Sequence, residues 1–243
     1  MIKGIYNSLA GMLPGTLRQE VAANNLANAN TVGYKKDRVF LQTMLDASLV
    51  MQKDANQNPL LLDAERVATD YGQGGLRSTG NPLDVALSGR GYFTVETSNG
   101  TRYTRAGAFS LNADGELVDS NGYTVQGDAG PITIPPGDVT ISEAGTIIVN
   151  GQEIGKLKVI DFEESDALVK QGENLFKASA GATECPAPQT SMRQGFLEDS
   201  NVNVVQEMVE MIKLQNTYQT SARVLMAQDE SLNKAVNDVG TVR

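Results

Sequence analysis

The sequence predicts an α+β fold in which long N- and C-terminal helices pack as a coiled-coil-like unit, with a central antiparallel β domain inserted between them. Three observations favour it. Most of the 24 glycines lie between Gly72 and Gly155, and no proline follows Pro188, so the middle is rich in turns and the ends are not. Both ends show apolar residues at helical spacing. Asn-Gly and Asp-Gly pairs punctuate the middle.

The C-terminal segment, assigned to residues 191–243, predicts one long amphipathic helix. Asn203, followed by Gln206, is typical of a helix start, and Gly240 is placed as its C-terminal cap. Val205, Val209 and Ile212 widen an apolar stripe that has the alternating four-three spacing of a heptad seam. The seam positions are Val204, Met208, Met211, Gln215, Tyr218, Ala222, Leu225, Asp229, Leu232, Val236 and Val239.

The N-terminal segment, assigned to residues 1–33, has a weaker version of the same pattern. It ends near Gly33, which can supply a left-handed cap. Pro14-Gly15 is expected to kink or interrupt the helix, because proline removes a backbone donor and clashes with the preceding turn. Many of its seam positions are small or polar, so this helix needs partners to bury apolar area. The seam positions are Ile2, Ile5, Leu9, Met12, Thr16, Gln19, Ala23 and Leu26.

The middle of the chain predicts antiparallel hairpins. Asn99-Gly100, Asp114-Gly115, Asn121-Gly122 and Asn150-Gly151 are flanked by β-branched or aromatic residues, and such pairs suit turns that need positive φ. We expect a β domain from Leu76 to about Lys177, within a region of residues 76–190 that includes a trailing connector. Residues 34–75 are expected to form an extended connector.

The inserted β domain makes the two ends one structural unit. The terminal helices can pack with neighbouring molecules, or they can form a helical hairpin on their own β domain. Small and polar seam residues favour packing between molecules, because such positions set register and partner number.

Composition argues against several classes of function. The chain has no histidine, which removes Ser-His, Cys-His and His-metal chemistry, and its single Cys185 allows no intramolecular disulfide. A net charge of −9 disfavours nucleic-acid partners, and Lys35 and Lys36 are interpreted as solvated surface. We see neither a secretory signal nor an apolar run of ~18 to 20 residues, so membrane insertion is not expected.

No catalytic, cofactor-binding or metal-binding residues are assigned. Asp161, Glu163 and Asp84 are the carboxylates that an acid-base enzyme would use, but acidic residues in an acidic protein are usually solvated. An enzyme active on the cell wall stays open as an alternative. It predicts two carboxylates facing one cleft.

An asparagine-rich run at residues 24–35, NNLANANTVGYK, resembles the N-terminal signature of the flagellar rod, hook and hook-associated proteins. The resemblance continues through residues 79–87, 89–93 and 103–109. It ends with GFLEDSNVN at residues 195–203 and the helix that follows. The chain is therefore similar to the flagellar basal-body rod protein family over its whole length.

The resemblance implies a structural subunit whose terminal helices assemble helically into the axial drive shaft and export channel of the basal-body rod. The modest β region matches a rod subunit better than a hook subunit, and residues 130–135 resemble the proximal rod protein more than the distal one, which is the alternative. The expected subunit-packing residues are Asn24, Asn25, Leu26, Asn28, Asn30, Gly33, Met208, Met211, Ile212, Tyr218, Gln219 and Leu225.

The implied partners are copies of the chain, other rod subunits and the flagellar type III export apparatus. The resemblance also implies a rod that spans the periplasm and subunits that are exported without a cleaved signal peptide. Phe40 and Met44 fit the spacing of an export-gate recognition segment in such subunits. A soluble adaptor or export chaperone, which would form a finite heterodimer, is the remaining alternative.

Overall fold

The computed structural model describes residues 2–43, 63–163, 167–179, 181–187 and 190–240. The chain divides into two compact units. Within the described residues, the helical unit contains 2–27, 37–43, 63–68 and 203–240, and the β unit contains 28–36 and the described part of 69–202.

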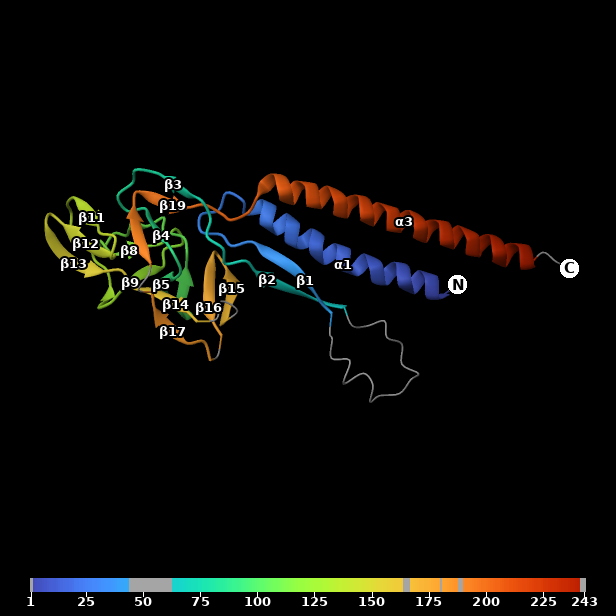
Figure 1. Ribbon diagram of the computed structural model, residues 1–243, viewed down its shortest axis with the longest axis horizontal. Coiled ribbons are helices and arrows are strands. Elements are labelled where there is room, and N and C mark those ends of the chain that lie inside the picture. Colours follow the sequence, from blue (N-terminus) through green and yellow to red (C-terminus); the bar gives the residue numbers. More distant parts are fainter. Residues whose placement is uncertain (1, 44–62, 164–166, 180, 188–189, 241–243) are drawn as a thin grey trace. The chain divides into compact units, whose positions relative to one another are not determined.

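The helical unit consists of two helices and a small sheet. Helix α1 (Ile2–Ala27) has 26 residues and is the shorter one, and α3 (Val204–Gly240) has 37. The two helices run side by side (Figure 1), and Gln19 donates a hydrogen bond of 3.1 Å to Gln215 between them. Strands β1 (Asp37–Thr43) and β2 (Asp63–Thr69) pair with each other. None of the described helices is long and apolar enough to cross a membrane.

The fold class predicted from the sequence is wrong, because the terminal helices do not form a coiled-coil-like unit. A coiled coil needs a continuous apolar seam that is buried between its helices. Of the α3 side chains described, at 204–231, 233 and 234, none is buried, and Met208 and Tyr218 of the expected seam are exposed. On α1, Ala22 and Asn25 are buried, whereas the expected Ala23 is exposed. The β unit is a large antiparallel β-sheet domain.

The helix ends agree only in part with the sequence. Asn203 caps α3 as expected, since its Oδ1 accepts a hydrogen bond of 3.1 Å from the Gln206 backbone N–H. Helix α3 still includes Gly240, the residue expected to cap it. Helix α1 continues through Pro14, so the expected interruption is wrong, and it ends at Ala27 rather than near Gly33.

The β unit is built from short antiparallel strands. They are β3 (Leu76–Ser78), β4 (Val85–Ser88), β5 (Tyr92–Thr97), β6 (Gly100–Thr104), β7 (Ser110–Leu111), β8 (Leu117–Val118), β9 (Thr124–Gly127), β10 (Gly130–Pro131), β11 (Val139–Ile141), β12 (Thr146–Val149), β13 (Gln152–Lys156), β14 (Val159–Phe162), β15 (Leu168–Gly172), β16 (Leu175–Ala178), β17 (Glu184–Pro186), β18 (Ser191–Gln194) and β19 (Phe196–Glu198).

Ten of these strands form the main sheet. Its path runs β15-β16-β6-β5-β9-β8-β7, with β10 on β9, and with β14 between β5 and β17. A second sheet has the order β11-β12-β13, and the pairs β18-β4 and β19-β3 complete the unit. Strands β18 and β19 therefore bring the segment that precedes α3 back to strands from the start of the unit.

The hairpins expected from Asn-Gly and Asp-Gly are confirmed. Asn99-Gly100 lies at the β5-β6 turn, and Asn150-Gly151 joins β12 to β13 with both φ angles positive, at 51° and 82°. Asp114-Gly115 and Asn121-Gly122 lie between β7 and β8 and between β8 and β9. These turns are local, so their residues alone specify them.

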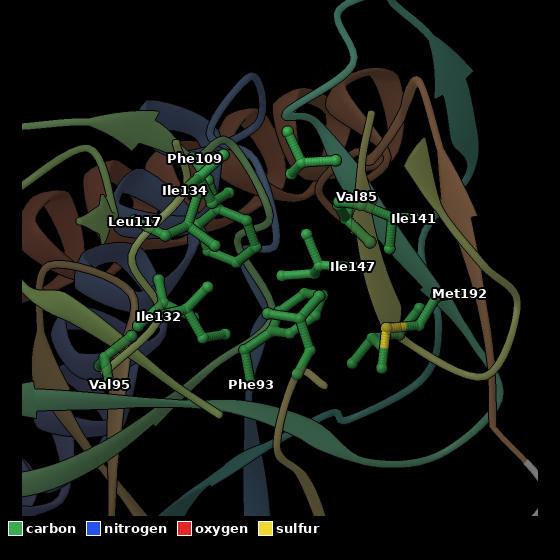
Figure 2. Packing of buried hydrophobic residues seen from close by; sticks show 14 of the residues in the cluster. Val85, Phe93, Val95, Phe109, Leu117, Ile132, Ile134, Ile141, Ile147 and Met192 are labelled. Carbon is green, nitrogen blue, oxygen red and sulfur yellow. The ribbon is translucent and has the colours of Figure 1, made fainter. Parts of the chain in front are cut away.

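The main core of the β unit is apolar and comes from several sheets. Figure 2 shows Ile147 of β12 among side chains that include Phe93 of β5 and Val85 of β4. Phe93 contacts Phe109 edge to face, with 5.0 Å between the ring centroids. A second, aromatic cluster contains Tyr92, Tyr103, Phe162, Leu168 and Phe176.

We expect Ile147→Ala to lower the free energy of unfolding by about 2 to 5 kcal/mol, because it opens a cavity in the main core. Ile154→Ala on the neighbouring strand β13 is the matched control, since Ile154 is exposed and its loss should cost about 1 kcal/mol or less. Urea unfolding followed by circular dichroism measures both. Equal losses would contradict this assignment of the core.

Candidate functional site

Asn25 ties the end of α1 to the start of β1. Its buried amide donates to the Asp37 carbonyl at 2.8 Å and accepts from the Asp37 backbone N–H at 2.9 Å. The side chain thus copies the two hydrogen bonds of a strand neighbour and fixes where the strand leaves the helix. Its neighbours Asn24 and Leu26 are exposed and half-buried, respectively.

The rest of the asparagine-rich run belongs to the β unit. Asn28 accepts a hydrogen bond of 3.3 Å from the Thr31 hydroxyl, and Asn30 is exposed. Gly33 is buried with φ of 70°, and its N–H donates to the Glu198 carbonyl at 2.7 Å. A Cβ at position 33 would lie 2.5 Å from the Ala106 backbone nitrogen, so only glycine fits there.

Lys35, the last residue of this run, meets two other buried charged side chains, Arg105 and Glu198; we call the three the junction cluster. Lys35 and Glu198 are each 1% exposed, and their Nζ and Oε1 atoms are 2.5 Å apart. Arg105 Nη1 lies 3.3 Å from the other oxygen of Glu198. The cluster therefore joins residues that are up to 163 positions apart in the sequence.

Backbone groups complete the junction cluster. Lys35 Nζ donates to the Gly72 carbonyl at 2.8 Å, and the Gly74 N–H donates to Glu198 at 2.9 Å. Arg105 donates to the Gly89 carbonyl at 2.8 Å and stacks over the Tyr92 ring at 5.1 Å. These contacts partly offset the cost of removing the charges from water.

Burial dominates the electrostatics of the junction cluster. It lowers the pKa of the Lys35 ammonium, and the Glu198 carboxylate opposes that shift. Burial also raises the pKa of the Tyr92 hydroxyl, and the positive charge of Arg105 opposes this shift by lowering the same pKa. Two buried cations face one carboxylate, so both have Glu198 as their neutralising partner.

Asn201 reinforces the same region of the β unit. Its Oδ1 accepts from the Lys36 N–H at 2.7 Å, and its Nδ2 donates to the carbonyls of Asp70 and Gly72 at 2.8 and 3.0 Å. One amide therefore connects the segment after α1, the segment after β2 and the segment before α3.

Helix α3 carries apolar side chains that the described residues leave exposed. Met208, Ile212 and Tyr218, three of the expected packing residues, are exposed, as is Gln219. Met211 and Leu225 are half-buried. Met208 and Ile212 lie one turn apart on the same face, and neighbouring exposed apolar side chains of this kind mark interaction surfaces.

A hollow of about 400 Å³ lies within the helical unit, between α1, β1 and α3. Val21, Ala22, Val39 and Leu214 give it an apolar lining. Its charged lining comes from Arg18, Asp37, Arg38, Glu207 and Glu210.

The carboxylates considered for acid-base chemistry do not converge. Asp161 Oδ2 pairs with Arg90 Nε at 3.2 Å, and Glu163 accepts a hydrogen bond from Cys185. Buried Asp84 accepts hydrogen bonds from Thr79 and Asn81 at 2.6 and 2.9 Å, which hold a loop together. Phe40, from the expected export segment, is exposed on β1, and Met44 lies outside the described residues.

The sequence matches three families of flagellar proteins. These are described as flagella basal body rod protein (residues 6–35), flagellar hook protein FlgE/F/G D1 domain (86–149) and flagellar basal body rod FlgEFG protein C-terminal (193–238). The flagellar basal-body rod protein FlgG of Bacillus subtilis is 33% identical over 98% of this chain and 99% of its own length. The chain belongs to the flagellar basal-body rod protein family.

Relatives named FlgG and relatives named FlgF match this chain at similar sequence identity. The rod protein FlgF of Caulobacter vibrioides is 32% identical over 100% of both chains, and FlgG of Agrobacterium fabrum is 35% identical over 94% of this chain and 96% of its own. As a member of this rod family, the chain is a structural protein of the flagellar basal body and not an enzyme.

The junction cluster takes one residue from each of the three matched regions. Lys35 lies in 6–35, Arg105 in 86–149 and Glu198 in 193–238. Sequence reasoning missed this cluster, and its assignment of Lys35 to solvated surface is wrong. The available signal was that each charge lies within a stretch that already resembled the rod family.

We expect Glu198→Gln to lower the free energy of unfolding by about 3 to 5 kcal/mol, because it leaves Lys35 and Arg105 buried without their carboxylate. Asp199→Asn is the control on the adjacent residue. Its carboxylate pairs with Arg77 at 3.0 Å on the surface, where such a pair contributes about 1 kcal/mol or less. Urea unfolding followed by tyrosine fluorescence measures both, and equal effects would refute a stabilising role for the cluster.

Proposed function

We propose that this chain is a subunit of the proximal rod, and that its terminal helices assemble helically with neighbouring subunits into the drive shaft and export channel. The exposed apolar surface of α3 carries this proposal. Its partners are copies of itself and other rod subunits. Neither nucleic-acid binding nor membrane insertion is part of the proposal.

Helix α3 has strong physical reasons to seek neighbours. Helices gain most of their stability from packing an apolar face, yet none of the described α3 side chains is buried. Covering Met208, Ile212 and Met226 in an assembly removes apolar area from water, at roughly 25 cal/mol per Å². Subunit contacts thus supply stabilisation that the isolated chain lacks.

The expected packing residues divide into three groups by their surroundings. Asn24, Asn30, Met208, Ile212 and Gln219 are exposed, so neighbouring subunits can contact them. Tyr218 belongs with them. Half-buried Leu26, Met211 and Leu225 can contribute their outer edges. Asn25, Asn28 and Gly33 already hold the chain's own backbone, so we propose that they support packing by fixing the segments beside the helix.

The junction cluster suits a protein under mechanical load. Buried ion pairs fix a unique geometry more than they add stability. Here they hold the segment after α1 and the segment before α3 to the same place in the β unit. We propose that torque arriving along the helices passes into the β unit through these segments.

The assignment to the proximal rod rests on residues 130–135. They form β10 and the segment that carries Ile132 and Ile134 into the main core, so this stretch is part of the folded β unit. The localisation that follows is the rod between the inner membrane and the distal rod, across the periplasm.

In a host strain lacking its own copy, the double variant Ile212→Asp, Met226→Asp should abolish swimming and lower the protein in purified basal bodies at least ~10-fold. Buried carboxylates oppose packing of the apolar α3 surface. Thr217→Asp with Thr220→Asp adds the same charge at exposed polar positions of the same helix and should be tolerated far better.

Equal incorporation of both double variants would contradict assembly through the apolar surface of α3. Circular dichroism of the purified variants checks that their secondary structure persists. Gold labelling of wild-type basal bodies locates the subunit, and a label at the hook end of the rod would favour the distal rod instead.

We also propose that Phe40 forms part of an export signal read by the flagellar type III apparatus, without cleavage of a signal peptide. Its side chain is 53% exposed, so it is accessible and contributes little to packing. Phe40→Ala should lower the secreted amount at least ~10-fold, measured by immunoblot of culture medium. Val67→Ala on the paired strand β2, where Val67 is 47% exposed, should secrete normally. Normal secretion of Phe40→Ala would refute the signal.

A further inference from the structure

We propose that the hollow between α1, β1 and α3 is a docking site for a ridge on α3 of a second copy of this chain. The ridge consists of Val205, Val209 and Ile212. The proposal rests on the proposed function, because it assumes that subunits meet through their terminal helices, and it names the two surfaces that meet.

The ridge is a compact apolar surface. Val205, Val209 and Ile212 are 71, 46 and 61% exposed. Their spacing of four and three residues places them on one face of the helix, over about two turns. Apolar anchors at this spacing are the usual way in which a helix binds a groove.

The hollow and the ridge lie on opposite faces of α3. Leu214, which lines the hollow, stands nine positions after Val205. Nine positions are about two and a half turns, so the two side chains point in opposite directions. Glu207, Met211 and Leu214, the half-buried residues of this stretch, define the face toward α1. A chain therefore cannot fill its own hollow with its own ridge.

The lining of the hollow matches the ridge in chemistry. Val21 and Ala22 of α1, Val39 of β1 and Leu214 of α3 offer apolar contacts. The volume of about 400 Å³ falls within the range of roughly 300 to 1,000 Å³ that is typical of sites that enclose a ligand. Apolar side chains of a second helix would be stabilised there, because docking in the hollow removes their surface from water.

Charges beside the two surfaces are complementary. Lys213 follows the ridge, is largely exposed, and pairs with Glu210 of its own helix at a loose 3.8 Å. The lining of the hollow contributes Asp37, Glu207 and Glu210 against Arg18 and Arg38. The Lys213 ammonium of a docked copy would thus meet Asp37 and Glu207 on the rim, in addition to Glu210, which Lys213 of the receiving copy already contacts. Such pairs fix register more than they add affinity.

Opposite placement of ridge and hollow determines the kind of assembly. Each copy gives its ridge to one neighbour and its hollow to another, so the contact is heterologous. A heterologous contact continues as a ring or an open helix, and it cannot stop at a two-fold dimer. Open growth is what a rod requires.

Disulfide trapping in the full-length chain tests the contact. Cys185→Ala removes the native thiol, and Ile212→Cys and Val39→Cys then place thiols on the ridge and in the hollow. Chains carrying one substitution each should form a mixed dimer on oxidation. Chains carrying both should give a ladder of trimers and longer species. Either single variant alone should stay monomeric, because ridge does not meet ridge and hollow does not meet hollow.

Matched aspartate variants test the energetics by analytical ultracentrifugation. Val209→Asp should lower the self-association constant at least ~10-fold. Val224→Asp should change it less than about twofold, although Val224 is also 46% exposed on the same helix, because it lies off the ridge. Circular dichroism checks that both variants remain folded.

The outcomes separate this proposal from the proposed function. A disulfide dimer of Ile212→Cys with itself, or equal losses from Val209→Asp and Val224→Asp, would overturn docking in the hollow while leaving assembly through α3 intact. Absence of self-association in the wild-type chain, together with absence of every expected disulfide in the cysteine variants, would overturn docking as well. Loss of rod incorporation in the α3 surface variants would still support the proposed function in that case.

Discussion

The contact between Glu198 and its two cations, Lys35 and Arg105, joins segments of the β unit that are far apart in the sequence. Its carboxylate serves Lys35, Arg105 and the Gly74 backbone at once, in a place that water does not reach. Because a buried charge without a partner is costly, each of these segments must be in place before the others are satisfied. The turn at Gly33 and the amide bridges of Asn201 depend on that same arrangement.

The two units solve the burial problem differently. The β unit closes around Ile147 and Phe93 with its own side chains, as a conventional antiparallel core. The helical unit leaves Val205, Ile212 and other apolar side chains exposed along α3. This division suits a polymer subunit: the β unit buries its apolar side chains in its own core, and the helical unit keeps apolar surface exposed for its neighbours.

Local features could be predicted from the sequence, and distant ones could not. The turns at Asn99-Gly100 and Asn150-Gly151 and the cap at Asn203 follow from a few adjacent residues. The sequence did not indicate which face of α1 is buried, because small and polar residues occupy several of its faces. Ala22 and Asn25 are buried, whereas Ala23 and Leu26 were expected on the seam. Lys35 was misplaced because its partner follows 163 positions later.

The order of segments along the chain has a consequence for how the protein matures. Both units combine early and late residues: 2–27 with 203–240 in one, and 28–36 with residues up to 202 in the other. Neither can close until the chain has emerged almost completely, and contacts over such separations form slowly. On the export route proposed above, the topology of the chain would keep it from folding inside a narrow passage, whichever end leads, and both units would close only after the whole chain has passed through.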